Sequence, residues 1–245
     1  MSNKKRLIIF VLALVIFTLL KAPVTMLAQQ APLPPNLAYQ GLSGTLWQGK
    51  IDRLQIQDWQ VANLTWSFAP LAVFSAQAGF DIKFGKARDA QQLSGKGRVG
   101  FGLSGPVVDE LTVRVPAAQV QGLLPIPVGE LGGRFIANIK DYSKGETLCQ
   151  TLSGNLMWTK ASVAMGDTIS FGTLDAELTC LNKNLMATFD GNNTLGLEGA
   201  ATVQSPESFS FDGFVKPDAS LPKMVHDSMA MFGKADSKGK YRIKL

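Results

Sequence analysis

The sequence predicts a mainly β protein in which an N-terminal transmembrane helix precedes a curved antiparallel β-sheet body that carries one to three short helices. Three observations predict this class. A cluster of cations is followed by an apolar run, which is the arrangement of a membrane anchor. From residue 37 onward apolar and polar residues alternate with a period of two, as they do in strands whose two faces have different surroundings. The chain of 245 residues also contains 24 glycines and 12 prolines, which suits many short strands joined by turns.

We expect residues 7–28 to form the transmembrane anchor. The uninterrupted apolar run covers residues 7–20, which is the length of a signal-peptide core. Lys21 can extend its aliphatic stem to the far interface and lengthen the span to about twenty residues. A signal peptide cleaved after Ala28 is the alternative, but Met26 occupies the position where a cleavage site needs a small residue. The pattern therefore favours an uncleaved anchor.

The cations at the N-terminus set the expected orientation. Lys4, Lys5 and Arg6 precede the apolar run, and positive residues stay on the cytoplasmic side of a membrane. Residues 1–6 would then be a cytoplasmic tip, and the body would lie in the periplasm of a single-pass inner-membrane protein. Residues 29–36 are rich in proline, which favours polyproline II and predicts a stiff linker between the bilayer and the body.

Residues 37–245 are expected to form the β-rich periplasmic domain. A Leu-Ser-Gly triplet recurs in it at residues 42–44, 93–95, 103–105 and 152–154. Glycine inside a strand marks a bend or the close approach of another backbone, so the triplets predict a curved sheet built from similar hairpins. Residues 42–47 and 152–158 echo each other, which leaves open a division into two halves, 37–146 and 147–245, or a coincidence among glycine-rich strands.

Proline positions indicate where short helices interrupt the strands. Pro70 opens a short segment that is plausible as one helical turn, and residues 116–123 are a second candidate. Around and after Pro222, which opens a third candidate helix, apolar residues recur at helical spacing; they are Leu221, Met224, Val225, Met229 and Phe232.

Two interpretations of this third helix remain open. In the first, the apolar stripe packs on the sheet, as most amphipathic helices do. In the second, Met224, Val225, Met229 and Phe232 form a docking surface for a partner, since methionine adapts to varied surfaces.

Residues 238–245 alternate cationic and apolar side chains and are expected to form a final strand. Lys240 and Arg242 share one face of that strand with Lys238 and Lys244. Such cations protect a sheet edge against aggregation, or they contact anionic lipid or an acidic partner.

The formal net charge of +5 arises at the two ends of the chain. Residues 1–28 carry four cations and no acid, and residues 216–245 carry seven cations and three acids. Residues 29–215 carry 13 cations and 16 acids, so the body is mildly acidic. A nucleic-acid-binding protein needs a basic face on its folded body, and we therefore expect no nucleic-acid partner.

Cys149 and Cys180 are the two cysteines of the chain. In an oxidising periplasm they are expected to form a disulfide, which closes a long loop and is worth roughly 3 kcal/mol in the chain-entropy model. Two unrelated buried thiols are the alternative.

No pattern of catalytic residues was found. His226 is the single histidine, which excludes a histidine-rich metal site, and the cysteines lack the paired spacing of a zinc site. Residues 95–100 match the dinucleotide-binding letters, but the sequence after them cannot begin a long helix, so a glycine-rich strand is expected there. Asp109 and Glu110 are adjacent and point to opposite faces of a strand. We expect no enzyme activity, no cofactor and no metal.

In their order along the chain, these features resemble the type II secretion system protein N family, also called general secretion pathway protein N. The resemblance covers essentially the whole chain. The residues that carry it are the N-terminal anchor, Gly-Leu-Ser-Gly-Thr-Leu-Trp-Gln-Gly at 41–49, Leu-Thr-Trp-Ser-Phe-Ala-Pro-Leu at 64–71, Cys149, Leu-Ser-Gly at 152–154 with Trp158, Cys180, and the basic C-terminal strand.

The resemblance implies a non-enzymatic inner-membrane component of the machine that exports folded proteins from the periplasm across the outer membrane. It further implies contacts with the inner-membrane platform proteins, with the protein that links them to the secretin, and with the secretin itself. A periplasmic lipid-binding or lipid-transfer protein with an apolar β-groove is the alternative function, because the alternation of apolar residues suits a groove as well as a filled core. Membrane lipid is an expected partner in either case.

Overall fold

The computed structural model describes residues 3–30, 34, 36–70, 78–102, 105–123, 129–205 and 208–244. Four helices and two 3-10 turns are present in these residues: α1 (Asn3–Lys21), α2 (Val24–Gln30), α3 (Ala117–Val120), η2 (Gln121–Leu123), α4 (Lys223–Met229) and η3 (Ala230–Phe232). The predicted helices over 116–123 and after Pro222 are thus confirmed. The predicted segment after Pro70 falls on residues 71–77, outside the described residues.

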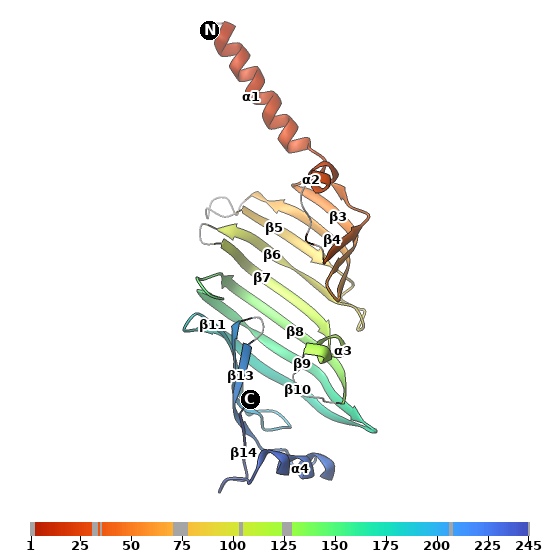
Figure 1. The fold of residues 1–245 in the computed structure, drawn as a ribbon, viewed down its shortest axis with the longest axis vertical. Coiled ribbons are helices and arrows are strands. Elements are labelled where there is room, and N and C mark those ends of the chain that lie inside the picture. Colours follow the sequence, from red (N-terminus) through yellow and green to blue (C-terminus); the bar gives the residue numbers. More distant parts are fainter. Residues whose placement is uncertain are drawn as a thin grey trace.

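The strands form one antiparallel sheet in which almost every strand pairs with its neighbours in sequence. In chain order they are β1 (Leu37–Gln40), β2 (Ser43–Gly44), β3 (Gln48–Ile56), β4 (Trp59–Ala69), β5 (Ala78–Phe84), β6 (Ser94–Gly102), β7 (Gly105–Pro116), β8 (Glu130–Ser143), β9 (Thr151–Met165), β10 (Asp167–Leu181), β11 (Asn184–Asp190), β12 (Glu198–Ser205), β13 (Ser208–Val215) and β14 (Tyr241–Lys244). The mainly β class and the single curved antiparallel sheet are confirmed (Figure 1). The sheet has 14 strands, whereas open twisted sheets rarely exceed about ten. Residues 146 and 147 lie in the loop between β8 and β9, and these two strands pair along most of their length, so one sheet continues on both sides of that loop.

The single anchor helix expected over residues 7–28 is divided into α1 and α2. Pro23 causes the division, because proline has no N–H to donate into a continuing helix and disfavours helical geometry in the residue before it. Pro23 instead forms a bridge with Thr45, beside β2. Within the described residues, no helix combines the length and the apolar character needed to span a bilayer. The predicted linker over 29–36 starts inside α2, and most of its remaining residues lie outside the described ones.

The two faces of the sheet have opposite character. Residues directly opposite each other in antiparallel strands point to the same face, so the register can be followed from strand to strand as a row. One row contains only apolar residues and glycine. From β3 to β13 it consists of Gly49, Trp66, Ile82, Gly97, Leu111, Ile139, Gly154, Leu178, Ala187, Ala201 and Phe211. We call the face that carries this row the inner face.

The adjacent row points to the other face, which we call the outer face. It is almost entirely polar and consists of Lys50, Thr65, Lys83, Lys96, Thr112, Asn138, Asn155, Glu177, Thr188, Ala200, Asp212 and Lys244. The period-two alternation of the sequence therefore becomes one apolar and one solvated face across the whole sheet.

Glycine occupies positions where neighbouring backbones come very close. A Cβ atom on Gly154 would lie 2.4 Å from the carbonyl oxygen of Asn138, and one on Gly97 would lie 2.2 Å from that of Glu110. The prediction that strand glycines mark close backbone approach is confirmed, and residues 95–100 lie in β6 as expected.

The compact core lies at the C-terminal end of the sheet. Val225 of α4 and Leu221, two residues before this helix, pack against Ile169, Phe171 and Leu174 of β10 on the inner face. This contact fixes α4 at the end of the molecule farthest from α1 (Figure 1).

Candidate functional site

The C-terminal end of the molecule exposes a group of large apolar side chains, which we call the apolar tip and define as Met224, Met231 and Phe232. Their exposed fractions are 45%, 86% and 42%. Met224 lies in α4, whereas Met231 and Phe232 lie in the 3-10 turn η3 that follows it. Exposed apolar groups gathered at one place are typical of protein contact sites.

The structure divides the set of residues that the sequence proposed for partner binding. Met224 and Phe232 are on the surface, but Val225 and Met229 are buried, with exposed fractions of 6% and 8%. Val225 belongs to the core with β10, so for it the packing interpretation is confirmed. Met231 was not among the residues proposed from the sequence. In a regular helix that continued past Met229, the spacing of apolar residues would not have distinguished position 231 from the others. The helix ends at Met229, and the tighter turn of η3 exposes Met231.

The two basic residues proposed for partner contact are engaged within the chain. Lys240 donates to Glu198 of β12, and the guanidinium of Arg242 lies 3.0 Å from a carboxylate oxygen of Asp212 in β13. Their charges are therefore largely compensated locally. Lys223 and Lys234 lie close in sequence to the apolar tip and form no ion pair among the described residues. Asp227 of α4 is also exposed and forms no ion pair among the described residues, so the surface around the apolar tip carries charges of both signs.

Two aspartates hold the turns on either side of this tip. The side chain of Asp236 accepts hydrogen bonds from the backbone N–H groups of Lys240 and Lys238, each 2.8 Å long, which lowers the pKa of its carboxyl. Asp218 precedes α4, and hydrogen bonds from the side chain and backbone N–H of Ser220 lower the pKa of its carboxyl. Both carboxylates order the segments that place α4 and β14.

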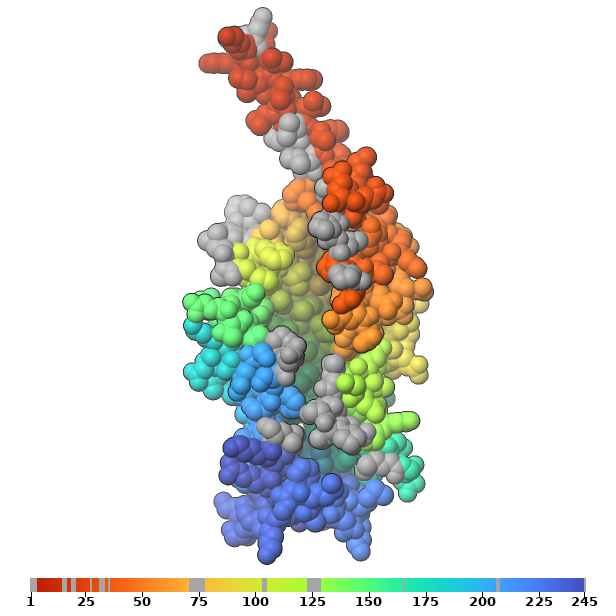
Figure 2. Space-filling view, viewed as in Figure 1, coloured from red at the N-terminus to blue at the C-terminus, as the bar shows by residue number. Residues whose placement is uncertain are grey.

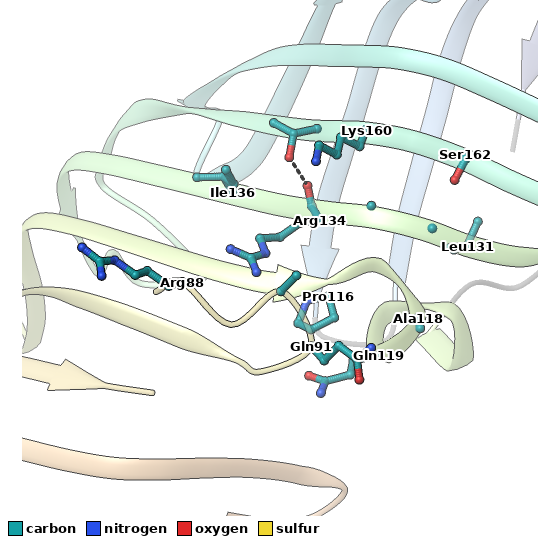
Figure 3. Close-up of a pocket in the computed structure, with 14 residues that line it drawn as sticks. Arg88, Gln91, Pro116, Ala118, Gln119, Leu131, Arg134, Ile136, Lys160 and Ser162 are labelled. Atoms are coloured by element: carbon teal, nitrogen blue, oxygen red, sulfur yellow. Dashed lines mark hydrogen bonds between the residues drawn. The ribbon is translucent and has the colours of Figure 1, made fainter. Parts of the chain in front are cut away.

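A basic groove lies between β8, β9 and α3, with a volume of about 970 Å³ (Figure 3). Arg88, Arg134 and Lys160 line it together with glutamine and hydroxyl side chains, and no carboxylate side chain is in its lining. The guanidinium of Arg134 donates hydrogen bonds to the backbone carbonyls of Ala87 (3.2 Å) and Asp89 (2.7 Å), and these bonds hold the loop between β5 and β6 against β8. The groove has the chemistry to hold a small anion but no nucleophile beside a general base.

Cys149 and Cys180 are joined by a disulfide with a Cα–Cα distance of 6.1 Å, as predicted. Cys149 precedes β9 and is fully buried, and Cys180 lies near the end of β10. The bond fastens the open end of the β9–β10 hairpin, where the backbone N–H of Leu148 also donates to Lys183.

The described part of the chain contains no group of three or more His, Cys, Asp and Glu side chains arranged to hold a metal ion. His226 of α4 is half-buried and lines a pocket together with residues that include Asp190, Asp218 and Lys240. The sheet ends at β1 on one side and at β14 on the other, and none of the described strands pairs with the outer edge of either.

Comparison with known proteins gives a consistent result. A family model described as "Type II secretion system (T2SS), protein N" matches residues 35–244. A protein of Vibrio cholerae serotype O1 named Type II secretion system protein N is 31% identical over 214 residues, which cover 86% of this chain and 84% of that protein. A protein of the same name from Aeromonas hydrophila is 28% identical over 243 residues, covering 96% and 94% of the two chains, and one from Klebsiella pneumoniae is 24% identical over 247 residues, covering 98% and 94%. No solved structure matches the chain significantly.

Proposed function

The chain belongs to the type II secretion system protein N family, and from that membership we propose that it is a non-enzymatic inner-membrane component of the system that exports folded proteins from the periplasm across the outer membrane. The family match over residues 35–244 is the observation that carries the proposal, because it spans the whole β body. The names of the relatives favour secretion over lipid transfer as the overall function.

The N-terminal segment that includes α1 and α2 attaches the protein to the inner membrane, with residues 1–6 in the cytoplasm and the body in the periplasm. Support comes from the described side chains of α1, most of which are apolar and exposed. Seven of its large apolar side chains are more than half exposed: Leu7, Ile8, Ile9, Phe10, Leu12, Leu14 and Phe17. A helix that is apolar all round is stable only when it is surrounded by protein or hydrocarbon. Lys4, Lys5 and Arg6 lie in the first turn of α1, before its apolar run, and favour a cytoplasmic N-terminus.

The apolar tip and the free strand edges make contacts with other secretion proteins. The tip lies at the opposite end of the sheet from α1, so a protein attached through α1 presents the tip away from the bilayer (Figure 1). Lys223, Asp227 and Lys234 are exposed and lie close to the tip in sequence, so they favour a partner segment that combines apolar side chains with charges of both signs. The edges of β1 and β14 offer a second mode, in which a partner strand extends the sheet. The partners are the platform proteins, the protein that links them to the secretin, or the secretin.

Secretion assays with charged substitutions test this function. Met231→Asp combined with Phe232→Asp replaces exposed apolar groups, so we expect a normal protein level but at least a fivefold drop in released exoprotein. The matched control is Ala235→Asp with Ser237→Asp, which adds the same charge to exposed positions a few residues away and should leave secretion within twofold of normal. Normal release from the Met231 and Phe232 variant, at normal protein level, would exclude the apolar tip as the contact site.

A further inference from the structure

The inner face of the sheet is apolar over eleven strands but covered over few of them. Among the described residues, α4 and the preceding Leu221 cover the inner face at the β9–β10 end, where Leu221 and Val225 pack on it. Toward the other end, inner-face side chains such as Trp66, Ile82 and Leu111 remain half-buried. A sheet of a soluble protein normally buries its apolar face completely against a second layer. The inner face therefore requires an apolar occupant that the described residues do not supply.

The shape of this face is a trough. The strands at both ends of the sheet curve toward the viewer in Figure 1, and Figure 2 shows a hollow between them over the middle of the sheet, above the blue C-terminal segment. Outer-face side chains such as Lys83, Lys96 and Glu177 are exposed, whereas their inner-face neighbours in sequence are not. The apolar row thus lines the concave side, and water surrounds the convex side.

The chemistry of the trough restricts its occupant. The apolar row offers no charge and no side-chain hydrogen bond to a ligand, and the backbone groups of its strands are used in the sheet ladder. A peptide strand placed on this face would leave its own N–H and C=O groups unpaired, which is costly. A second copy does not fit either, because two concave faces enclose a void, whereas packed sheets need to interdigitate about 10 Å apart. Hydrocarbon chains have no polar groups that would be left unpaired, and they are flexible enough to fill a concave surface without a void.

The position of the trough supplies the source of the hydrocarbon. Its first strands lie at the base of the N-terminal helices, where Pro23 bridges Thr45 and α2 lies beside β2 (Figure 1). The exposed apolar surface of α1 and the apolar trough are therefore neighbours on the molecule. This step rests on the membrane attachment proposed above, which places the α2 end of the trough next to the bilayer.

We propose that the inner face binds the acyl chains of membrane phospholipid, which enter at the β3–β4 end and lie along the trough toward α4. The row from β3 to β13 covers ten strand spacings of about 4.8 Å, or about 48 Å. One leaflet of a bilayer contributes about 15 Å of hydrocarbon, so the trough holds the chains of more than one lipid.

The test uses the full chain incorporated in vesicles of phosphatidylethanolamine and phosphatidylglycerol that contain a phospholipid with a photoreactive group on its acyl chain. After illumination, labelled peptides are identified by mass spectrometry. The expected result is labelling of strands β4–β9 in addition to α1. Labelling confined to α1, or mass spectrometry that finds a co-purifying peptide in the trough instead of lipid, would overturn the proposal.

Matched substitutions sharpen the test. Ile139→Glu puts a charge in the middle of the trough, whereas Asn138→Glu puts the same charge on the outer face one residue away. We expect at least a fivefold loss of labelling in β4–β9 for the first and less than a twofold change for the second. Ala137→Trp fills the trough without adding charge and should also reduce labelling, which keeps the test informative if Ile139→Glu folds poorly. Equal labelling in Ala137→Trp and the unmodified protein would contradict the proposal.

The outcome is separable from the proposed function. A reporter enzyme fused at the C-terminus determines on which side of the membrane the body lies, and the secretion assay measures export. Loss of trough labelling with a periplasmic body and normal secretion would remove the lipid site alone.

Discussion

The disulfide between Cys149 and Cys180 is predicted to be a main contributor to the stability of the sheet. The sheet is a single layer over most of its area and has its compact core only near α4, so constraints on the unfolded chain carry unusual weight. We consider the double substitution Cys149→Ala and Cys180→Ala. Alanine is preferred to serine because Cys149 is fully buried, and a buried hydroxyl would need its own hydrogen-bond partner.

The magnitude follows from the length of the loop that the bond closes. The two cysteines are 31 positions apart, and the chain-entropy relation gives a stabilisation of about 3–4 kcal/mol at 25 °C. With a urea m-value of about 3 kcal/mol/M, the unfolding midpoint should fall by about 1 M. The assay is pulse proteolysis of the full chain in mild detergent over a series of urea concentrations. The unmodified protein treated with a reductant is the control, and it should show the same decrease. A decrease below about 1 kcal/mol, or two thiols that react freely in the unmodified protein, would refute the reasoning.

Three further predictions concern single positions. The first is that Gly97→Ala should lower the free energy of unfolding by about 1–3 kcal/mol in the same assay, because the new methyl group meets a backbone oxygen. The control Gly122→Ala places its methyl group in open space and should be neutral or stabilising by up to about 1 kcal/mol. Equal effects of the two substitutions would show that close backbone approach is not the cause. The second is that Val225→Asp should lower the free energy of unfolding by at least about 2 kcal/mol and make α4 susceptible to limited proteolysis, because it removes a buried apolar side chain from the core. The control Met224→Asp, on the exposed side of the same helix, should lower the free energy of unfolding by less than about 0.5 kcal/mol. The third prediction concerns Asp236, whose pKa lies below its ordinary value of 3.8, so its carboxylate stabilises the turn before β14 above pH 3.8 and this stabilisation is lost as the pH falls through the lowered pKa. Protease cleavage near the turn should therefore rise below pH 3.8. The variant Asp236→Asn should show the same cleavage already at about pH 7.

Much of the fold was predictable because it depends on local patterns. The alternation of apolar and polar residues from residue 37 predicted strands, and the strand glycines predicted close backbone approach, which Gly97 and Gly154 show. The short helix after Pro222 and the disulfide were also predicted correctly. Each of these features is set by neighbours in sequence or by a single pair of residues.

The features that depend on long-range register were not predictable. Lys240 pairs with Glu198 across 42 positions, and Arg242 pairs with Asp212 across 30, so their free charge could not be judged from the sequence. The exposure of Met231 depends on where α4 gives way to η3. The apolar row of the inner face likewise appears only when the pairing of every strand is known. Pro23 is the exception, because its effect on the helix over residues 7–28 is local and could have been foreseen.

The contact between the apolar tip and another secretion protein is the central claim, and site-specific photocrosslinking in living cells tests it most directly. A photoreactive amino acid replaces Met231 in one strain and Thr188, an exposed outer-face residue of β11, in another. The account predicts a crosslink from position 231 to a platform protein, to the protein that links the platform to the secretin, or to the secretin, and no such crosslink from position 188. Cells that secrete normally while position 231 captures none of these proteins would contradict it.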